Sequence, residues 1–265
     1  MLRQRVVSAL VGLALLTLAL WWGGEWGWAA FVAIAAVIGV LEFYRLARHA
    51  DAQPLTLLGC IWTAALVFSP VATSLPNRAT LAVLGGGLFA CLISLLARRD
   101  KKGSLATLAW TIAGVAYVGW FSQYLVALRT LDSGRNWVAL ALLTTFATDT
   151  SAYFVGRAWG RHRLAPDVSP GKTKEGATAG LLGGIAAAWA LSSLLHLPIS
   201  TWQSLLLGLL ISVFAQLGDL TESLFKRSAG VKDSGGLMPG HGGLLDRIDS
   251  ILLAGFAVYY YVLFV

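Results

Sequence analysis

The residues with the clearest potential for chemistry lie in one polar segment of a strongly apolar chain, residues 226–249 (KRSAGVKDSGGLMPGHGGLLDRID). This segment combines three carboxylates, Asp233, Asp246 and Asp249, with basic side chains and several glycines. Glycines let a backbone approach a ligand closely and form anion-binding nests. Carboxylates are usual ligands of Mg²⁺. The combination indicates a site for phosphate groups and a divalent cation.

Carboxylates also lie at the ends of the neighbouring apolar runs, where an ionisable group is costly in a membrane and usually functional. Asp149 lies near the end of one run and Asp219 near the end of another. Asp246 and Asp249 are three residues apart at a predicted helix start, so simple capping remains open for this pair. Capping does not explain Asp219. A cluster of this kind resembles a Mg²⁺ site that binds substrate phosphates.

Helical spacing places a lysine beside these acids. Asp219, Ser223 and Lys226 share one helix face, and Glu222 precedes Lys226 by four residues. Basic residues continue through the polar segment. His241 stands between glycines and has no bulky neighbour in sequence, so both a functional and a structural role stay open for it.

A second basic segment, Ser169–Glu175 (SPGKTKE), precedes a helix predicted to begin near Glu175. It is not a phosphate-binding P-loop, because Pro166 stands where that motif requires glycine. Ser169, Lys172, Thr173 and Lys174 still suit phosphate at a helix N-terminus. The alternative is an ordinary positively charged loop.

The composition indicates that membrane-spanning helices position these residues. The chain is 57% hydrophobic and only 12% charged, with a mean hydropathy of +0.71, whereas soluble domains carry about 25% charge. The first residues resemble a signal peptide, but no cleavage site follows, so we predict a retained span. Cys60 and Cys91 fit small buried side chains.

The fold class predicted from these patterns is an all-α polytopic integral membrane protein. About nine apolar runs approach the roughly 20 residues that a spanning helix needs, near 7–22, 26–44, 55–74, 79–97, 105–128, 136–156, 176–196, 201–225 and 246–264. All but three of the 20 Lys and Arg residues fall on one side of this arrangement. The positive-inside rule therefore places the N-terminus in the cytoplasm and the C-terminus outside.

The chain shows no linker, low-complexity tract or clear repeat, so residues 1–265 are predicted to form a single membrane domain. Within it, residues 1–100 form N-terminal helices of low motif content, and residues 136–265 supply the catalytic helices and cytoplasmic loops. The net charge of +7 fits the positive-inside bias and lipid phosphate rather than nucleic acid.

The segment SLFKRSAGVKDSGGLMPGHGGLLDRID closely resembles the signature of the phosphatidate cytidylyltransferases, also called CDP-diacylglycerol synthases. The mild departure is Met238, where the family usually has Ile, Leu or Phe. DTSAYFVGR and SPGKTKEG also look like family elements, whereas the first hundred residues carry little that is specific. Every fixed polar position of the signature is present: Ser223, Lys226, Arg227, Lys232, Asp233, His241, Gly242, Gly243, Asp246, Arg247 and Asp249.

The resemblance implies synthesis of CDP-diacylglycerol and pyrophosphate from CTP and phosphatidate with Mg²⁺. Asp219 and Asp246 are then the leading metal ligands, and Asp149 and Asp249 are candidates for a second shell or a second ion. Lys226 and His241 join Asp219, Asp246 and Asp249 as the predicted catalytic residues. The predicted substrate-binding residues are Ser169, Lys172, Thr173, Ser223, Arg227, Lys232, Asp233, Gly242, Gly243 and Arg247.

The same resemblance implies a cell inner-membrane location, with phosphatidate arriving from the inner leaflet, an active site at the cytoplasmic face and a homodimer. A CDP-alcohol phosphotransferase is disfavoured, because the chain has no Asp-Gly-x-x-Ala-Arg string. The remaining alternative is a transporter that couples ions through interfacial carboxylates. Transporter sites lie near the membrane midplane, often between repeated halves, which is not the pattern of this sequence.

Overall fold

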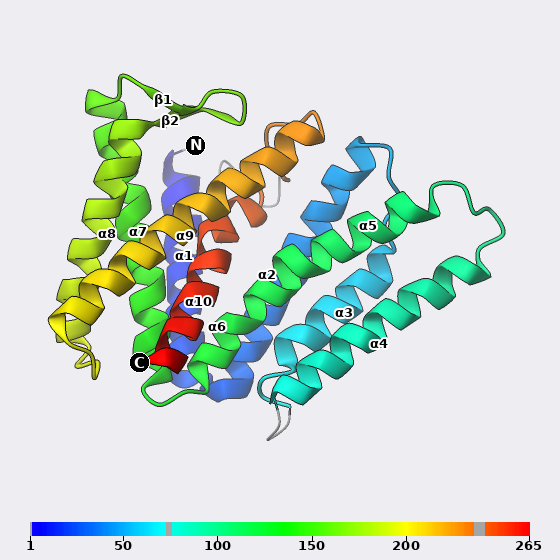
Figure 1. The fold of residues 1–265 in the computed structure, drawn as a ribbon, viewed down its shortest axis with the longest axis horizontal. Helices are drawn as coiled ribbons and strands as arrows, with labels where there is room; N and C mark the ends of the chain where they lie inside the picture. Colours follow the sequence, from blue (N-terminus) through cyan, green and yellow to red (C-terminus); the bar gives the residue numbers. More distant parts are fainter. Residues whose placement is uncertain (1, 73–75, 236–241) are drawn as a thin grey trace. The chain divides into compact units, whose positions relative to one another are not determined.

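The computed structural model describes residues 2–72, 76–235 and 242–265 (Figure 1). It divides into two compact units. Unit 1 comprises Met1–Thr130 and Ser228–Asp246, and unit 2 comprises Leu131–Arg227 and Arg247–Val265. The prediction that the whole chain forms one membrane domain is not tested by this division and stays a prediction.

Helices build unit 1. They are α1 (Leu2–Trp22), α2 (Gly24–His49), α3 (Thr56–Phe68), α4 (Pro76–Ala97), α5 (Ser104–Gly114), a π-helical turn (Val115–Trp120) and α6 (Phe121–Arg129). Close helix approach depends on small residues, as is typical of helices in membranes. A Cβ on Gly59 would lie 2.1 Å from the Tyr44 hydroxyl oxygen, and one on Gly114 would lie 2.5 Å from the Tyr44 ring. Tyr44 is fully buried and donates a 2.9 Å hydrogen bond to the Thr111 carbonyl.

Unit 2 contains α7 (Gly134–Trp159), β1 (Arg163–Ala165), β2 (Ser169–Thr173), α8 (Lys174–Leu194), α9 (Thr201–Ser228) and most of α10 (Leu245–Phe264). Helices α7 and α8 run side by side, and α9 crosses them (Figure 1). Glycines on α8 permit this contact, since a Cβ on Gly184 would clash with Ser212 and Thr148. Thr148 and Ser212 are buried and hydrogen-bond to each other at 3.0 Å.

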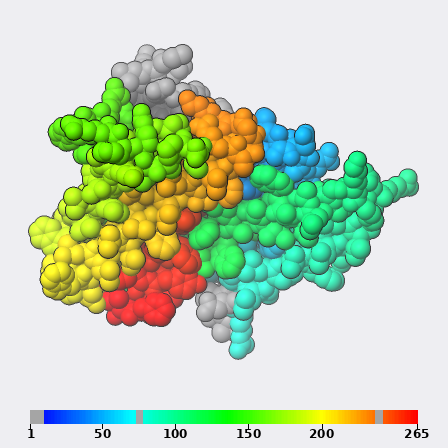
Figure 2. Space-filling view, turned by 45° about the horizontal axis from the view of Figure 1, so that its top comes forward, coloured from blue at the N-terminus to red at the C-terminus, as the bar shows by residue number. Residues whose placement is uncertain are grey.

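The all-α prediction needs one addition, because the segment read as a loop contains a two-stranded antiparallel hairpin. In it Arg163 pairs with Thr173 and Ala165 with Ser169. Figure 2 shows this hairpin in bright green at the surface of unit 2, next to α8. The hairpin is too short to produce an alternating hydrophobic pattern, so the sequence carried no strand signal.

The structure supports an all-α membrane protein. A described helix overlaps each of the nine predicted spans. Seven of the described helical segments are long and apolar enough to cross a membrane, whereas Leu10–Trp22 and Thr56–Phe68 are shorter. The exact number of spans and the orientation of the termini stay predictions.

Candidate functional site

An ion pair in unit 2 links the basic segment Ser169–Glu175 to the predicted metal ligand on α9. Lys172 Nζ lies 2.8 Å from Asp219 Oδ2. Lys172 comes from β2 and Asp219 from α9, and their side chains are 24% and 36% exposed. The lysine predicted to bind phosphate therefore contacts the carboxylate predicted to bind a metal. The Lys172 ammonium nitrogen itself is buried, so the exposed part of this pair is the Asp219 side chain and the lysine stem.

Thr173 fixes the position of this lysine. Its hydroxyl oxygen accepts a 3.1 Å hydrogen bond from the Gly176 N–H and caps the N-terminus of α8. Thr173 is only 5% exposed, and a Cβ on Gly156 would lie 3.0 Å from its hydroxyl. The predicted helix start after this segment is confirmed. In the structure Thr173 anchors the helix, while Ser169 lies at the other end of β2.

The acidic residues of unit 2 form a cluster around Asp219. Asp149 on α7 interacts electrostatically with Asp219 and Lys172, and its carboxylate is hydrogen-bonded by the Ser250 side chain. Asp249 on α10 is only 6% exposed and interacts with Asp149 and Asp219. Its Oδ1 accepts a 2.7 Å hydrogen bond from the Ser250 N–H. Three helices thus bring like charges together, an arrangement that a cation stabilises.

The close contact of α9 with α10 depends on Gly218. A Cβ at this position would lie 2.4 Å from the Asp249 carbonyl oxygen. The residue before Asp219 must therefore be small for Asp249 to approach. Glycine here serves helix packing, a role that the sequence analysis did not assign.

Lys226 forms an ion pair with Glu222, four residues earlier on α9. The Glu222 side chain is fully buried and that of Lys226 is 14% exposed. Breaking such a pair would leave a charge in a dry environment. The predicted i, i+4 contact is confirmed, and Lys226 has a structural partner in addition to its predicted catalytic role. The neighbouring Ser223 is 9% exposed.

Arg227 connects the end of α9 to the β1–β2 hairpin. Its Nε donates a 3.2 Å hydrogen bond to the Val168 carbonyl, in the turn between the two strands. The side chain of Arg227 is exposed, as is that of Arg247 in the first turn of α10. Arg227 therefore holds the hairpin that carries Lys172.

Asp246 organises the glycine-rich segment of unit 1. Its Oδ2 accepts hydrogen bonds from the Gly243 N–H at 2.8 Å, the Ser234 hydroxyl at 3.0 Å and the Ser234 N–H at 3.3 Å. Gly242 has a left-handed φ of +84°, which favours glycine. Lys232 and Asp233 are exposed. Asp246 thus holds the glycine-rich segment from the first turn of α10, and its hydrogen-bond donors lie outside that helix, so the capping alternative stays a prediction.

His241 lies outside the described residues, so its predicted role stays a prediction. Asp219 and Asp246 belong to different units. The predicted meeting of their carboxylates therefore also stays a prediction.

Glu42 is a residue of this region that the sequence analysis missed. It lies on α2, is fully buried, and its Oε2 accepts a 2.8 Å hydrogen bond from the Leu245 N–H at the start of α10. A Cβ on Gly235 or Gly243 would lie 2.6 Å from a Glu42 carboxylate oxygen. The available signal was a lone acid inside an apolar run.

We expect Glu42→Ala to destabilise the protein by about 2–3 kcal/mol, because the buried Leu245 N–H would lose its acceptor. Glu42→Gln keeps an acceptor oxygen and should cost clearly less. Thermal unfolding of both variants in detergent micelles measures the difference. Equal melting temperatures for wild type, Glu42→Ala and Glu42→Gln would show that Glu42 does not anchor α10.

The carboxylates of unit 2 suit a Mg²⁺ ion that is held jointly by the protein, substrate phosphates and waters. Among residues 2–72, 76–235 and 242–265, no three His, Cys, Asp or Glu side chains form a group that could hold a metal by themselves. Mg²⁺ is usually held by one or two carboxylates together with substrate phosphates and waters. The Asp149 and Asp219 carboxylates, with Lys172 already attracted to Asp219, supply oxygen donors of that kind.

Comparison with known proteins agrees with this chemistry. The model of the cytidylyltransferase family matches residues 3–265. A phosphatidate cytidylyltransferase from Synechocystis sp. is 34% identical over 292 residues, covering 98% of this chain and 96% of the relative. A phosphatidate cytidylyltransferase from Brucella abortus biovar 1 is 35% identical over 262 residues, covering 97% of this chain and 92% of the relative. Because these matches extend over nearly the whole length, the chain belongs to the cytidylyltransferase family.

Proposed function

We propose that the protein is a phosphatidate cytidylyltransferase, which forms CDP-diacylglycerol and pyrophosphate from CTP and phosphatidate. The family match over residues 3–265 carries this proposal. The Lys172–Asp219 pair beside the N-terminus of α8 supplies a suitable phosphate-binding surface. The family and the named relatives favour this enzyme over an ion-coupled transporter.

In this reaction an oxygen of the phosphatidate phosphate attacks the α-phosphorus of CTP. The bond from the α-phosphorus to the bridging oxygen breaks, and pyrophosphate leaves with that oxygen. Such transfers depend mainly on positioning and on stabilisation of charge. In this proposal Lys172, Arg227 and Arg247 bind phosphate oxygens through charge-assisted hydrogen bonds. No protein nucleophile is required.

We propose Mg²⁺ as the cofactor, with Asp219 as a ligand, Asp149 in its immediate surroundings and Asp246 as the second ligand predicted from the signature. When bound, the ion would neutralise charge on the triphosphate. Asp149 and Asp249 would keep the local potential negative enough to favour a cation, and Lys172 would turn from Asp219 to the phosphates. The support from the structure is the acidic cluster of unit 2.

The location and partners complete the proposal. We infer that the protein lies in the cell inner membrane with its site at the cytoplasmic face, because most Lys and Arg residues fall on the side of the signature. Phosphatidate would then enter from the inner leaflet, and CTP from the cytosol. The homodimer implied by the family resemblance is part of the same proposal.

The test of the activity is incubation of the purified protein with labelled CTP, phosphatidate and Mg²⁺. Label should appear in a lipid extract only when phosphatidate is present, with an equal amount of pyrophosphate released. Pyrophosphate release that does not depend on phosphatidate would contradict the proposal and indicate another nucleotide reaction.

We expect Lys172→Ala to raise the KM for CTP by roughly 10- to 100-fold, because a charge-assisted hydrogen bond of about 1.5–3 kcal/mol is lost. The measurement is steady-state CDP-lipid synthesis over a range of CTP concentrations. Arg163→Ala is the matched control, since it removes one positive charge from the exposed face of the partner strand. Unchanged CTP kinetics in Lys172→Ala would show that this segment does not bind CTP and is an ordinary positively charged connection.

A further inference from the structure

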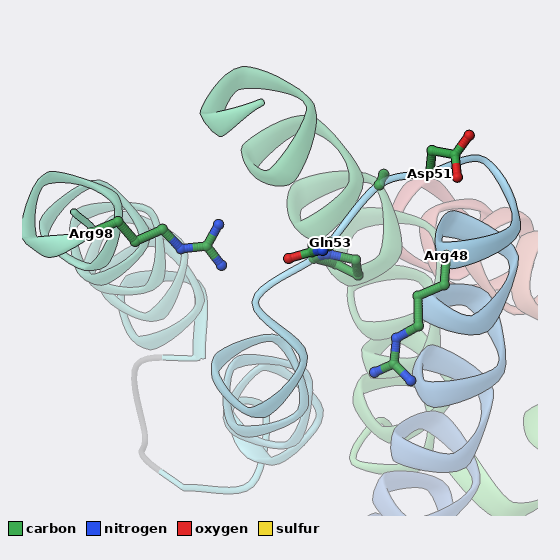
Figure 3. Close-up of a pocket in the computed structure, with 6 residues that line it drawn as sticks. Arg48, Asp51, Gln53 and Arg98 are labelled. Carbon is green, nitrogen blue, oxygen red and sulfur yellow. The ribbon is translucent and has the colours of Figure 1, made fainter. Parts of the chain in front are cut away.

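A cavity of about 470 Å³ lies in unit 1, away in sequence from every residue assigned to cytidylyl transfer. It is found where α2 and α4 end and α3 and α5 begin. Figure 3 shows its labelled polar side chains. The residues that line it are Arg48, Asp51, Ala52, Gln53, Pro54 and Arg98.

Both arginines of the cavity are held by a threonine near the start of the next helix. Arg48 Nη2 donates to Thr56 Oγ1 at 3.1 Å, and Arg98 Nη1 donates to Thr107 Oγ1 at 3.4 Å. A guanidinium carries five N–H donors, so each arginine retains donors for a ligand. Side chains held in advance lose less entropy on binding. The cavity therefore has the features of a prepared anion site.

The charges of the cavity favour an anion that offers pairs of oxygen atoms. Arg98 extends from the end of α4 toward Gln53, whereas the Asp51 carboxylate points away from Gln53 (Figure 3). Two guanidinium groups outweigh this single carboxylate. Arginine matches phosphate through paired hydrogen bonds, which a lysine cannot form.

Exposed apolar side chains lie close in sequence to the polar residues of the cavity on three of the adjoining helices, α3, α4 and α5. Leu57 on α3, Leu96 on α4 and Leu105 on α5 are between 76% and 80% exposed. Leu57 follows Thr56, Leu96 lies two residues before Arg98, and Leu105 lies two residues before Thr107. Exposed leucines of this kind are better suited to contact with lipid chains than with water. Figure 2 shows α4 and α5, in cyan to green, at the surface of unit 1. A ligand for this place has an anionic head and apolar chains.

We propose that this cavity binds the phosphate headgroup of an anionic phospholipid, whose acyl chains lie along Leu57, Leu96 and Leu105. Basic pockets between membrane helices bind such headgroups. The site uses none of the residues assigned to catalysis, so it is a second lipid site beyond the proposed function. It fits a lipid that stays bound as a membrane component, because none of the carboxylates assigned to the metal lines it.

The test uses the full chain in nanodiscs of phosphatidylcholine to which phosphatidylglycerol is added in increasing proportion. The melting temperature of wild type should rise with phosphatidylglycerol and saturate. In the double variant Arg48→Gln with Arg98→Gln, half-saturation should need at least about tenfold more phosphatidylglycerol. The matched control is Arg45→Gln with Arg99→Gln, which changes the charge equally at exposed neighbours that do not line the cavity. The control should respond like wild type.

Two results would overturn the site. One is an equal loss of response in both double variants, which would indicate general attraction to a charged surface. The other is a wild-type response to inorganic phosphate in pure phosphatidylcholine nanodiscs as large as that to phosphatidylglycerol, which would indicate a free-anion site. If the double variant is unstable in phosphatidylcholine alone, the lipid affinity of Arg98→Lys is measured instead, because this variant keeps the charge and loses the paired hydrogen bonds. Wild-type lipid affinity in Arg98→Lys would refute paired hydrogen bonding. None of these measurements requires cytidylyl transfer, so this site can fail while the proposed activity stands.

Discussion

Replacing Asp219 by Asn should reduce turnover roughly 10³-fold while the protein folds and inserts normally. The side chain keeps its volume but loses the charge that attracts both Lys172 and the proposed Mg²⁺. The Lys172–Asp219 pair is partly exposed, with side-chain exposures of 24% and 36%. Lys172 Nζ itself is buried, so the loss of its charged partner should lower the free energy of unfolding by about 1–3 kcal/mol, although the new amide oxygen can still accept a hydrogen bond. Steady-state kinetics and thermal unfolding of the same preparation separate these two effects.

Asp167→Asn is the matched control for this experiment. It makes the same change of charge at an exposed position between β1 and β2, in the same unit. Its turnover should stay close to that of wild type. A variant Asp219→Asn that retains near-wild-type CDP-lipid synthesis would show that Asp219 is not a metal ligand. The Lys172 contact would then be a structural ion pair.

Replacing Asp246 by Asn should also lower turnover, by roughly 10²- to 10³-fold, but with a measurable effect on structure. Asp246 Oδ2 accepts hydrogen bonds from the Ser234 hydroxyl, the Ser234 N–H and the Gly243 N–H. An amide oxygen can still accept them, although without the added strength of a charge. We expect a loss of about 1–2 kcal/mol and faster hydrogen exchange at the Ser234 and Gly243 amides.

The control for Asp246 is Asp233→Asn, an exposed acid of the same segment. Asp233 also belongs to the signature, so activity is not the readout of this control. Hydrogen exchange is the readout, because it reports the support of the loop separately from metal binding. Exchange at Ser234 and Gly243 should respond to Asp246→Asn alone. Faster exchange with full activity in Asp246→Asn would assign this residue to the support of the loop and exclude it as a metal ligand.

A double-mutant cycle tests whether Asp219 and Asp246 act on one ion. If both hold the same Mg²⁺, the double variant should be little slower than the slower single variant, since the ion is already misplaced. Independent roles would multiply the two losses. Multiplied losses would contradict the two-ligand metal site predicted from the sequence, while leaving each residue important for turnover.

The tight packing around these residues limits which substitutions are informative. Gly218 and Gly243 both lie where a Cβ would contact the protein within 3 Å. Alanine at Gly218 would displace Asp249, and alanine at Gly243 would displace the Ser234 and Glu42 side chains, along with any effect on catalysis. The isosteric Asp-to-Asn changes avoid this difficulty, because they alter charge while keeping volume.

Local sequence patterns predicted the helices and the chemical character of the signature. Apolar runs of nearly 20 residues, broken by short polar stretches, coincide with helices α1 to α10. Spacing within a helix predicted the Glu222–Lys226 contact and placed Asp246 and Asp249 in one helical turn. Helical periodicity and hydrophobic length are properties of consecutive residues, so they can be read without knowledge of the fold.

Contacts between distant segments were decided by tertiary packing alone. The Lys172–Asp219 ion pair depends on a hairpin whose strands are too short to show a pattern. Glu42 reaches Leu245 across 203 positions of sequence, although the first hundred residues carried little that resembled the family. A lone buried acid indicates that some partner exists, but not which one. Its partner depends on which helices pack together and on where glycines let their backbones approach, and those are properties of the assembled fold.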